Sequence, residues 1–199
     1  MSRQAERSDA TRARLVRAAR GLFAKRGYAA VGTEEIVRRA KVTRGALYHH
    51  FEDKRDLFRA VHEQIEAEVT NAIAADLAGA GADDPVEALT RAVRAFLDAC
   101  TRPEIARITL LEAPSVLGWA EWRRIDEQYG LGLTIAGLTA GMEAGRLRRQ
   151  PVRPLAHLLL AALGEAGMVI ANAEDPRVAR AEVEPALLSL LEGLQEPRA

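Results

Sequence analysis

The chain has 199 residues, 48% of them hydrophobic, and its 28 Lys and Arg residues balance 28 Asp and Glu residues. This composition excludes disordered and collagen-like chains, and the single cysteine, Cys100, excludes an internal disulfide and a multi-cysteine metal site. The N-terminal segment is polar and lacks the apolar stretch of a signal peptide, so we expect a cytoplasmic protein.

The charge is unevenly divided along the chain. Residues 1–60 hold 15 Lys and Arg against 7 Asp and Glu, a net of +8, whereas residues 61–199 have a net of −8. This division predicts two parts with different tasks. The first part either faces a polyanion such as a nucleic acid or simply carries a solvated basic face.

The apolar residues predict an all-α chain of about nine helices, because every interpretable segment has helical spacing and no run alternates like a strand. The first helix is expected over residues 9–26, and Gly27 ends it. Two short helices follow over residues 33–40 and 44–50, each capped by the hydroxyl of a threonine, Thr33 or Thr43. Two helices of this length, joined by a short turn, have the size of a helix-turn-helix.

A longer helix over residues 54–77 carries an apolar row at four-residue spacing, so its whole length should be buried and should join the basic part to the rest. The row is Leu57, Val61, Ile65, Val69, Ile73 and Leu77. An Ala- and Gly-rich stretch at residues 78–82 breaks this helix, and Asp84 caps the next one, which starts with Pro85.

Further helices are expected over residues 103–111, 119–144 and 154–173, and a last one begins at Asp175 and Pro176. The 154–173 helix is apolar enough to resemble a membrane span. His157 and Glu165 interrupt it, however, so we expect a buried or interface helix and no membrane partner.

The segment over residues 33–57 closely resembles the DNA-binding segment of the TetR family of bacterial transcriptional regulators, and the resemblance covers roughly residues 10–60. The matching positions are Thr33, Ile36, Ala40, Val42, Thr43, Gly45, Leu47, Tyr48, His50, Phe51, Lys54 and Leu57. The resemblance implies a helix-turn-helix DNA-binding domain over residues 1–56 and a helical ligand-binding and dimerisation domain over residues 57–199. It further implies a homodimer on a palindromic double-stranded DNA operator, usually a repressor that a small-molecule effector releases.

The third helix supplies the expected base contacts, because a helix fits the major groove, where Arg forks onto guanine and small side chains allow close approach. The candidates for base readout on its outer face are Arg44, Gly45, Ala46 and His49. The candidates for phosphate contacts are Thr33, Thr43, Tyr48, Lys54 and Lys41. The resemblance implies the same role for Thr43, Tyr48 and Lys54.

Two residues depart from the usual pattern. Lys41 stands in the turn where glycine is usual, which forces a positive φ on a lysine, and Val37 stands where alanine is usual between the two helices. Both put the docking geometry in question.

Arginines at the start of the chain form either an arm that reaches the DNA or a frayed, solvated end. They are Arg3, Arg7, Arg12 and Arg14.

The C-terminal helices mix leucines with small residues, which favours close helix packing and a two-fold, four-helix dimer interface. The interface candidates are Leu159, Leu163, Gly164, Gly167, Leu187, Leu191 and Leu194. Large apolar residues with a few polar tips are candidates for an effector pocket, although each could be ordinary core. They are Phe96, Cys100, Leu110, Trp119, Trp122, Tyr129, Met142 and His157.

Two other functions compete with a ligand-responsive regulator. A ligand-independent architectural DNA-binding protein would share the basic part but lack an enclosed pocket. A helical metal-dependent enzyme would use Asp83, Asp84 and Glu87, but a helix start explains these residues and no second acidic motif follows. We therefore expect no enzymatic activity, no cofactor and no metal.

Overall fold

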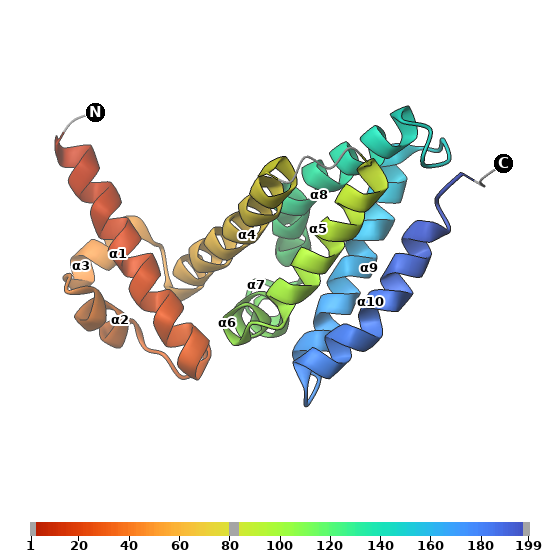
Figure 1. Cartoon of the computed structure of the whole chain (residues 1–199). Helices are drawn as coiled ribbons and strands as arrows, with labels where there is room; N and C mark the ends of the chain where they lie inside the picture. The colour runs from red at the N-terminus through yellow and green to blue at the C-terminus, as the bar shows by residue number, and fades with distance from the viewer. Residues whose placement is uncertain (1–2, 80–83, 197–199) are drawn as a thin grey trace.

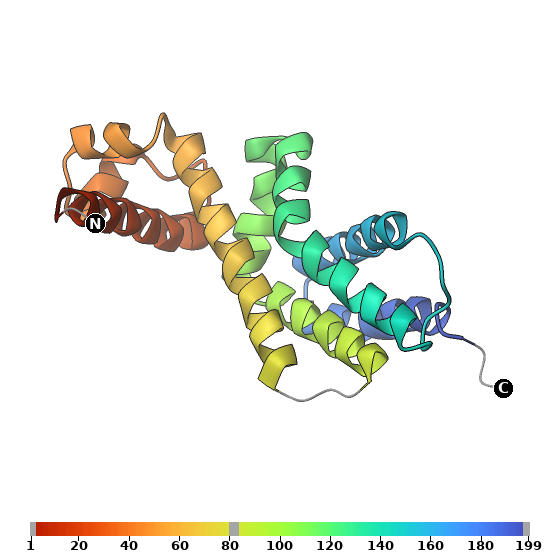
Figure 2. The same ribbon diagram turned by 90° about the horizontal axis from the view of Figure 1, so that it is seen from above.

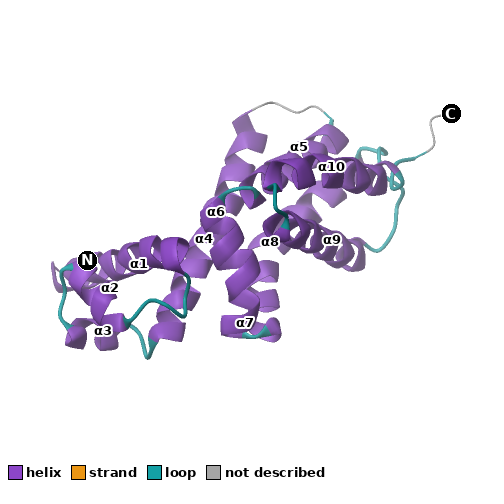
Figure 3. Ribbon diagram, turned by 90° about the horizontal axis from the view of Figure 1, so that it is seen from below, coloured by secondary structure: helices purple, strands orange, loops and turns teal. Residues whose placement is uncertain are grey.

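The computed structural model describes residues 3–79 and 84–196, and within these residues it consists of helices and loops without a named strand (Figure 1, Figure 3). The first four helices are α1 (Arg3–Arg26), α2 (Thr33–Ala40), α3 (Arg44–His50) and α4 (Lys54–Gly79). The others are α5 (Pro85–Cys100), α6 (Pro103–Ile105), the π-helix η1 (Ala106–Glu112), α7 (Ala113–Leu117), α8 (Trp119–Glu143), α9 (Val152–Asn172) and α10 (Pro176–Glu192). The all-α class is confirmed.

Helices α1–α3 lie at one end of the molecule and α9 and α10 at the other, with α4 running between them (Figures 1 and 2). Two hydrophobic cores hold this arrangement together. The first core combines buried residues of α1–α4 with buried residues of α6, η1, α7 and the start of α8. The second core joins α5, the rest of α8, α9 and α10.

Several predicted helix ends are confirmed by the caps. Gly27 follows α1 with φ 79°, and the side chain of Thr43 caps α3 by accepting a hydrogen bond from the amide of Ala46 at 3.2 Å. Asp84 caps α5 and Asp175 caps α10 in the same way. These are local signals, so the sequence is sufficient to identify them.

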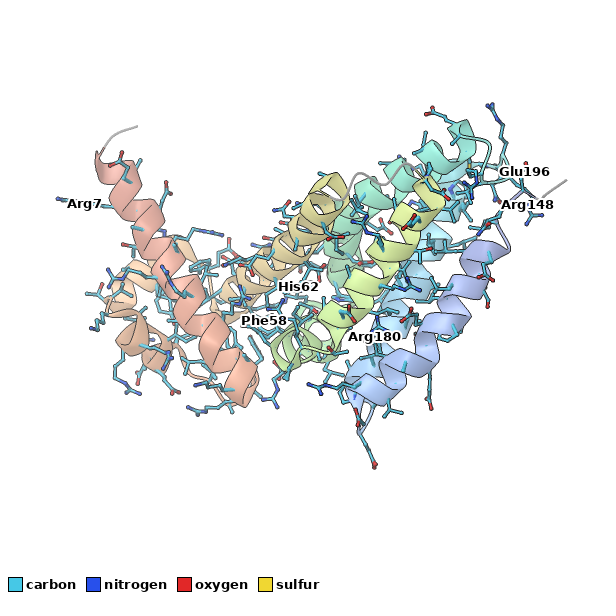
Figure 4. The ribbon with its side chains drawn as sticks, in the orientation of Figure 1. Arg7, Phe58, His62, Arg148, Arg180 and Glu196 are labelled. Atoms are coloured by element: carbon cyan, nitrogen blue, oxygen red, sulfur yellow. The ribbon has the colours of Figure 1, made fainter. Side chains whose placement is uncertain are left out.

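Other boundaries differ from the prediction. Helix α1 begins at Arg3 rather than at residue 9, so Arg7 and Arg12 belong to a regular helix, and the side chain of Arg3 lies outside the described residues. In Figure 4 Arg7 points away from the body of the molecule. The predicted cap by Thr33 is wrong: Gly32 is the N-cap of α2, makes no side-chain hydrogen bond, and leaves Thr33 as the first helical residue. The break at residues 78–82 lies largely outside the described residues.

The helix predicted over residues 103–111 is longer and irregular. It continues through Pro114 to Leu117, and its middle, Ala106–Glu112, is a π-helix. The wider turn leaves a backbone carbonyl for the indole of Trp122, whose Nε1 donates a hydrogen bond to the oxygen of Thr109 at 2.9 Å. Counting α6, η1 and α7 as one continuous segment, the described part of the chain has the nine helices expected.

Helix α9 is the one described helix that is long and apolar enough to cross a membrane. A core helix passes the same test. In this fold α9 packs into the second core through buried residues such as Ala156, Leu159 and Ile170.

Candidate DNA-binding surface and ligand cavity

The outer surface of α3 carries the four residues predicted to read bases. Arg44, Gly45 and His49 are exposed and Ala46 is half-buried, whereas Leu47 on the same helix is fully buried in the first core. The short helix is therefore held by one face and presents the other to solvent. The structure brings these four candidates together, and their contacts to DNA remain a prediction.

Arg44 is held above the protein surface by its neighbours. Its guanidinium carbon lies 5.6 Å from the ring centroid of Tyr48, and its Nη1 lies 4.0 Å from a carboxylate oxygen of Glu34. Stacking on Tyr48 restricts the guanidinium without burying it. Tyr48 is itself exposed, so its phenol is also free for a phosphate contact.

The left-handed backbone predicted for Lys41 is confirmed by its φ of 54°. The guanidinium of Arg14 stabilises this turn by donating hydrogen bonds to the carbonyls of Ala40 and Lys41. These bonds satisfy carbonyls at the C-terminal end of α2, where the helix offers no further donor. Arg14 is thereby part of the fold, and the side chain of Lys41 is left exposed.

Lys54 has a structural role that the sequence did not indicate. Its ammonium donates hydrogen bonds to the carbonyls of Tyr28 and Val31 at 3.0 and 3.1 Å and lies 4.1 Å from the ring centroid of Tyr28. Two of the three N–H groups are thus bound within the protein. A phosphate contact by Lys54 stays a prediction, and only one N–H is left for it.

A second basic surface lies between α1 and the end of α2, and sequence reasoning did not identify Arg17 and Arg39 as part of it. A shallow hollow of about 360 Å³ is lined by two residues of α1, Arg14 and Arg17, and by Arg39 and Lys41 at the end of α2, together with alanines. None of the described lining residues is acidic. The three-residue spacing of Arg14 and Arg17 could have placed them on one helix face, but their proximity to Arg39 depends on how α1 and α2 cross.

A cavity of about 280 Å³ lies among α4, α5, α8 and α9. Its lining is mainly apolar, with Glu66, Thr70, Asp126 and Thr134 as the polar exceptions. Such a cavity is near the lower end of the range of small-molecule sites, about 300–1,000 Å³. Of the eight residues predicted for the pocket, Phe96 alone is among the lining residues.

The other seven pocket candidates lie elsewhere. Cys100, Leu110 and Trp122 are buried in the cores, Tyr129 and Met142 pack against them, Trp119 is 66% exposed, and His157 is half-buried with its Nδ1 3.4 Å from Glu127. The prediction rested on residue type, and residue type does not distinguish a cavity wall from a filled core. The relevant signal was instead the face of α4 that includes Glu66 and Thr70.

The acids of the cavity have perturbed proton affinities. Burial raises the pKa of Glu66 to about 8, and the nearby charge of Asp126 adds to the effect. Burial likewise raises the pKa of Asp126 to about 6, although Arg123 at 2.8 Å opposes the shift. One turn before Glu66, burial lowers the pKa of His62 to about 4, so this histidine is neutral at neutral pH.

The residues predicted for a dimer interface on α9 and α10 are buried or partly buried within the chain, and their contacts to a second copy remain a prediction. Leu159, Gly167, Leu187 and Leu191 are buried inside the chain, and Leu163, Gly164 and Leu194 are partly buried. The exposed apolar residues of these helices are Leu158, Val169, Val178 and Leu190. One residue turns a helix position by about 100°, so exposed residues next to the predicted ones, such as Leu158 and Leu190, face away from the core.

The acidic segment considered for an enzyme has structural roles. Asp84 accepts a hydrogen bond from the amide of Val86 at 3.0 Å and lies 2.8 Å from Arg146. Asp83 lies outside the described residues, and Glu87 is exposed on the first turn of α5. The described residues contain no group of three or more His, Cys, Asp or Glu placed to hold a metal ion.

Family models of known proteins match both the N-terminal and the C-terminal part of the chain. The family described as "Bacterial regulatory proteins, tetR family" matches residues 15–61, and "Tetracyclin repressor-like, C-terminal domain" matches residues 86–194. The chain is 31% identical to the transposon Tn10 TetC protein of Escherichia coli over 160 residues, 78% of each chain. It is 36% identical to the HTH-type transcriptional regulator CymR of Pseudomonas putida over 97 residues, 48% of each chain.

Solved structures agree with these matches. A TetR-family transcriptional regulator from Pectobacterium atrosepticum superposes with a TM-score of 0.87 at 35% identity and covers all of both chains. The structure of RolR in complex with resorcinol superposes with a TM-score of 0.74 at 24% identity, over 94% of this chain and 89% of that one. At 24% identity, the match to RolR shows only that the two proteins share a fold.

Proposed function

Because this chain belongs to the TetR family of bacterial transcriptional regulators, we propose that it acts in the cytoplasm as a homodimer that binds a palindromic operator and releases it when a small molecule fills the cavity. We propose a regulatory role and no enzymatic one. The observation that carries the proposal is that a single helix, α4, belongs to both the DNA-binding part and the cavity.

The two ends of α4 have different neighbours. Leu57, Phe58 and Val61 near its start are buried in the first core against α1–α3. Ile73 and Leu77, more than two turns further along, line the cavity. The start of α4 follows α3 in the chain and packs in the same core. A ligand that displaces the cavity end of α4 would therefore also change the position of α3.

Polar contacts connect α1 and the start of α4 to the rest of the chain. Arg20 pairs with Glu104 on α6 at 2.7 Å, and the amide of Tyr28 donates a hydrogen bond to Glu112 at the end of the π-helix at 2.9 Å. Arg55 pairs with Glu121 on α8 at 2.6 Å. These contacts join segments of the first core, so they would hold that core together while a ligand shifts the balance between two arrangements by binding one of them more tightly.

The proposed dimer forms through α9 and α10. These two helices lie at the end of the molecule away from α1–α3 and carry exposed apolar residues, so a two-fold pairing through them would leave both α3 helices free (Figure 1). The paired α3 helices would then meet two half-sites about 34–36 Å apart, or a multiple of that distance. The proposed base contacts come from α3 and the proposed phosphate contacts from Thr33, Thr43, Tyr48, Lys54 and Lys41.

The cavity favours this function over that of an architectural DNA-binding protein, which needs no ligand site. The decisive experiment is selection of bound sites from random double-stranded DNA by the purified full-length protein. A two-fold symmetric consensus supports the proposal. Failure to bind duplex DNA at low salt, or a consensus with a single unrepeated half-site, would overturn it.

A further inference from the structure

The acidic residues of the cavity lie at one end, and the rest of its lining is apolar except for Thr70 and for Thr134, whose hydroxyl is bound to the carbonyl of Gly130. Glu66 on α4 and Asp126 on α8 both line it, and Gly137, eleven residues after Asp126, lies about 16 Å further along the axis of α8. At that far end an added Cβ on Gly137 would lie 2.6 Å from Leu89, so the apolar wall is closely packed there. A ligand that fills this space has an extended apolar body and one polar end.

Glu66 has no partner for its charge. The side chain lines the cavity and is 22% exposed, and its ion-pair contact within the described residues is His62, whose Nδ1 lies 3.8 Å from its Oε1. Arg123 is paired with Asp126 at 2.8 Å and with Glu127 at 3.3 Å. Among the described residues that line the cavity there is no Lys, Arg or His.

The histidine beside Glu66 does not supply the missing charge. His62 is fully buried, its Nδ1 lies 3.8 Å from Glu66, and neither of its ring nitrogens has a hydrogen-bond partner in the described part of the chain. Burial keeps its pKa far below neutrality, so the imidazole carries no positive charge. Figure 4 shows His62 and Phe58 on α4 at the junction between the N-terminal helices and the rest.

From these contacts we propose that the cavity binds an elongated apolar molecule with a single cationic amino group, and that the ammonium lies against the carboxylate of Glu66. This inference rests on the proposed role of the cavity as the effector site. An anionic ligand would face Glu66, which has no cationic partner among the described residues, and Asp126, whose charge Arg123 already pairs. A neutral hydroxyl would make a hydrogen bond that is weaker than a charge-assisted one.

The proposal is tested with three probes of the same size: 4-phenylbutylamine, 4-phenylbutanol and 4-phenylbutyrate. Their affinities for the full-length protein are measured by isothermal titration calorimetry without DNA. We expect the amine to bind at least about tenfold more tightly than the alcohol, because a charge-assisted bond is roughly twice as strong as a neutral one, and the carboxylate to bind most weakly. Equal affinities of amine and alcohol, or no binding by any of the three probes, would overturn the proposal.

A charge-matched pair of variants locates the cation. Glu66→Gln should bring the affinities of amine and alcohol to within about threefold of each other, because it removes the charge-assisted bond. Glu63→Gln makes the same substitution on the same helix outside the cavity lining and should preserve the preference. An amine preference that survives in Glu66→Gln would refute the assignment.

Proton release gives a test on the unmodified protein. The titratable groups around Glu66 are His62 on α4, Asp126 and Tyr129 on α8, and Cys100 on α5. At pH 7 a bound ammonium should drive about one proton from Glu66, and the alcohol should release none. Calorimetry in two buffers of different ionisation enthalpy measures this difference, and equal release by the two probes counts against the proposal.

The proposed ligand class and the proposed effector role of the cavity are refuted by different results. Amine-selective binding that leaves operator affinity unchanged, measured by fluorescence anisotropy, would retain the ligand class and remove the effector role. Release of the operator by the alcohol, at an affinity equal to that of the amine, would retain the effector role and overturn the ligand class.

Discussion

Replacing Leu158 with alanine should weaken the dimer, whereas the same change at Leu159 should weaken the folded chain. Leu158 is 70% exposed on α9 and Leu159 is 7% exposed, although the two residues are adjacent. Leu158 therefore has most of its surface left to bury against a second copy, and Leu159 has already buried its surface in the second core.

The exposed fraction sets the size of the effect. Full burial of a leucine contributes about 1.5–3 kcal/mol, so 70% of that surface is worth about 1–2 kcal/mol. A two-fold interface contains Leu158 twice, which gives about 2–4 kcal/mol per dimer and a dissociation constant raised roughly 30- to 1,000-fold. Leu159→Ala instead leaves a core cavity and should lower the free energy of unfolding by about 2–5 kcal/mol.

Sedimentation equilibrium over a dilution series measures the dissociation constant, and urea unfolding at a fixed protein concentration measures stability. The concentration must be matched, because dimerisation itself stabilises the folded chain. Leu190→Ala on α10, a residue that is 58% exposed, is the companion variant and should behave like Leu158→Ala. The assignment of this face fails if Leu158→Ala and Leu190→Ala dimerise like the parent chain.

Three further predictions concern the DNA surface, the junction and the cavity. Arg44→Ala should cost about 1–3 kcal/mol of operator binding and relax the sequence preference at one base pair. Lys41→Ala should weaken binding to all DNA sequences alike and lower the slope of log affinity against log salt concentration by about 1. Anisotropy titrations at several salt concentrations separate the two variants, and identical effects of both on binding to random DNA would contradict this. Gly27→Ala should lower the unfolding midpoint by roughly 2–8 °C, since φ is 79° and the new Cβ would lie 2.5 Å from Glu112 Oε1; an unchanged midpoint in thermal unfolding would refute this. Glu66→Gln should stabilise the protein more at alkaline than at acidic pH. The folded chain keeps the Glu66 proton up to a pKa of about 8, whereas the unfolded chain loses it near 4.5. The stability of the parent chain therefore falls by a few kcal/mol, to order of magnitude, as the pH rises between these values. Urea unfolding of the variant with the same pH profile as the parent would contradict this.

Local signals in the sequence were sufficient for most of the secondary structure. A side-chain cap depends on a few neighbouring residues, which is why Thr43, Asp84 and Asp175 are caps as predicted. The predicted cap by Thr33 is wrong because the residue before it, Gly32, is extended and occupies the cap position, which places the threonine inside the helix. Even here the error is a single residue.

The parts that the sequence did not reveal depend on contacts between distant segments. The binding of Lys54 to the carbonyls of Tyr28 and Val31 arises from the way the loop after α1 passes the start of α4. The cavity depends on which gaps between four helices remain unfilled, and a list of large apolar residues does not contain that information. The π-helix also has no simple sequence signature, because it reflects one extra residue accommodated in a turn.

The packing suggests where a ligand-driven motion would divide the molecule. The division proposed at residues 56 and 57 falls within the first core, in which Leu57 and Phe58 pack together with Ile108 and Leu117 from the later helices. A packed core resists gradual deformation, so a motion is more easily accommodated between the two cores than inside one of them. The cavity is lined both by the second half of α4 and by second-core residues such as Leu89, and this is the boundary at which a ligand would act. In that case α1–α3, the first half of α4 and the segment α6–α7 would move as one body.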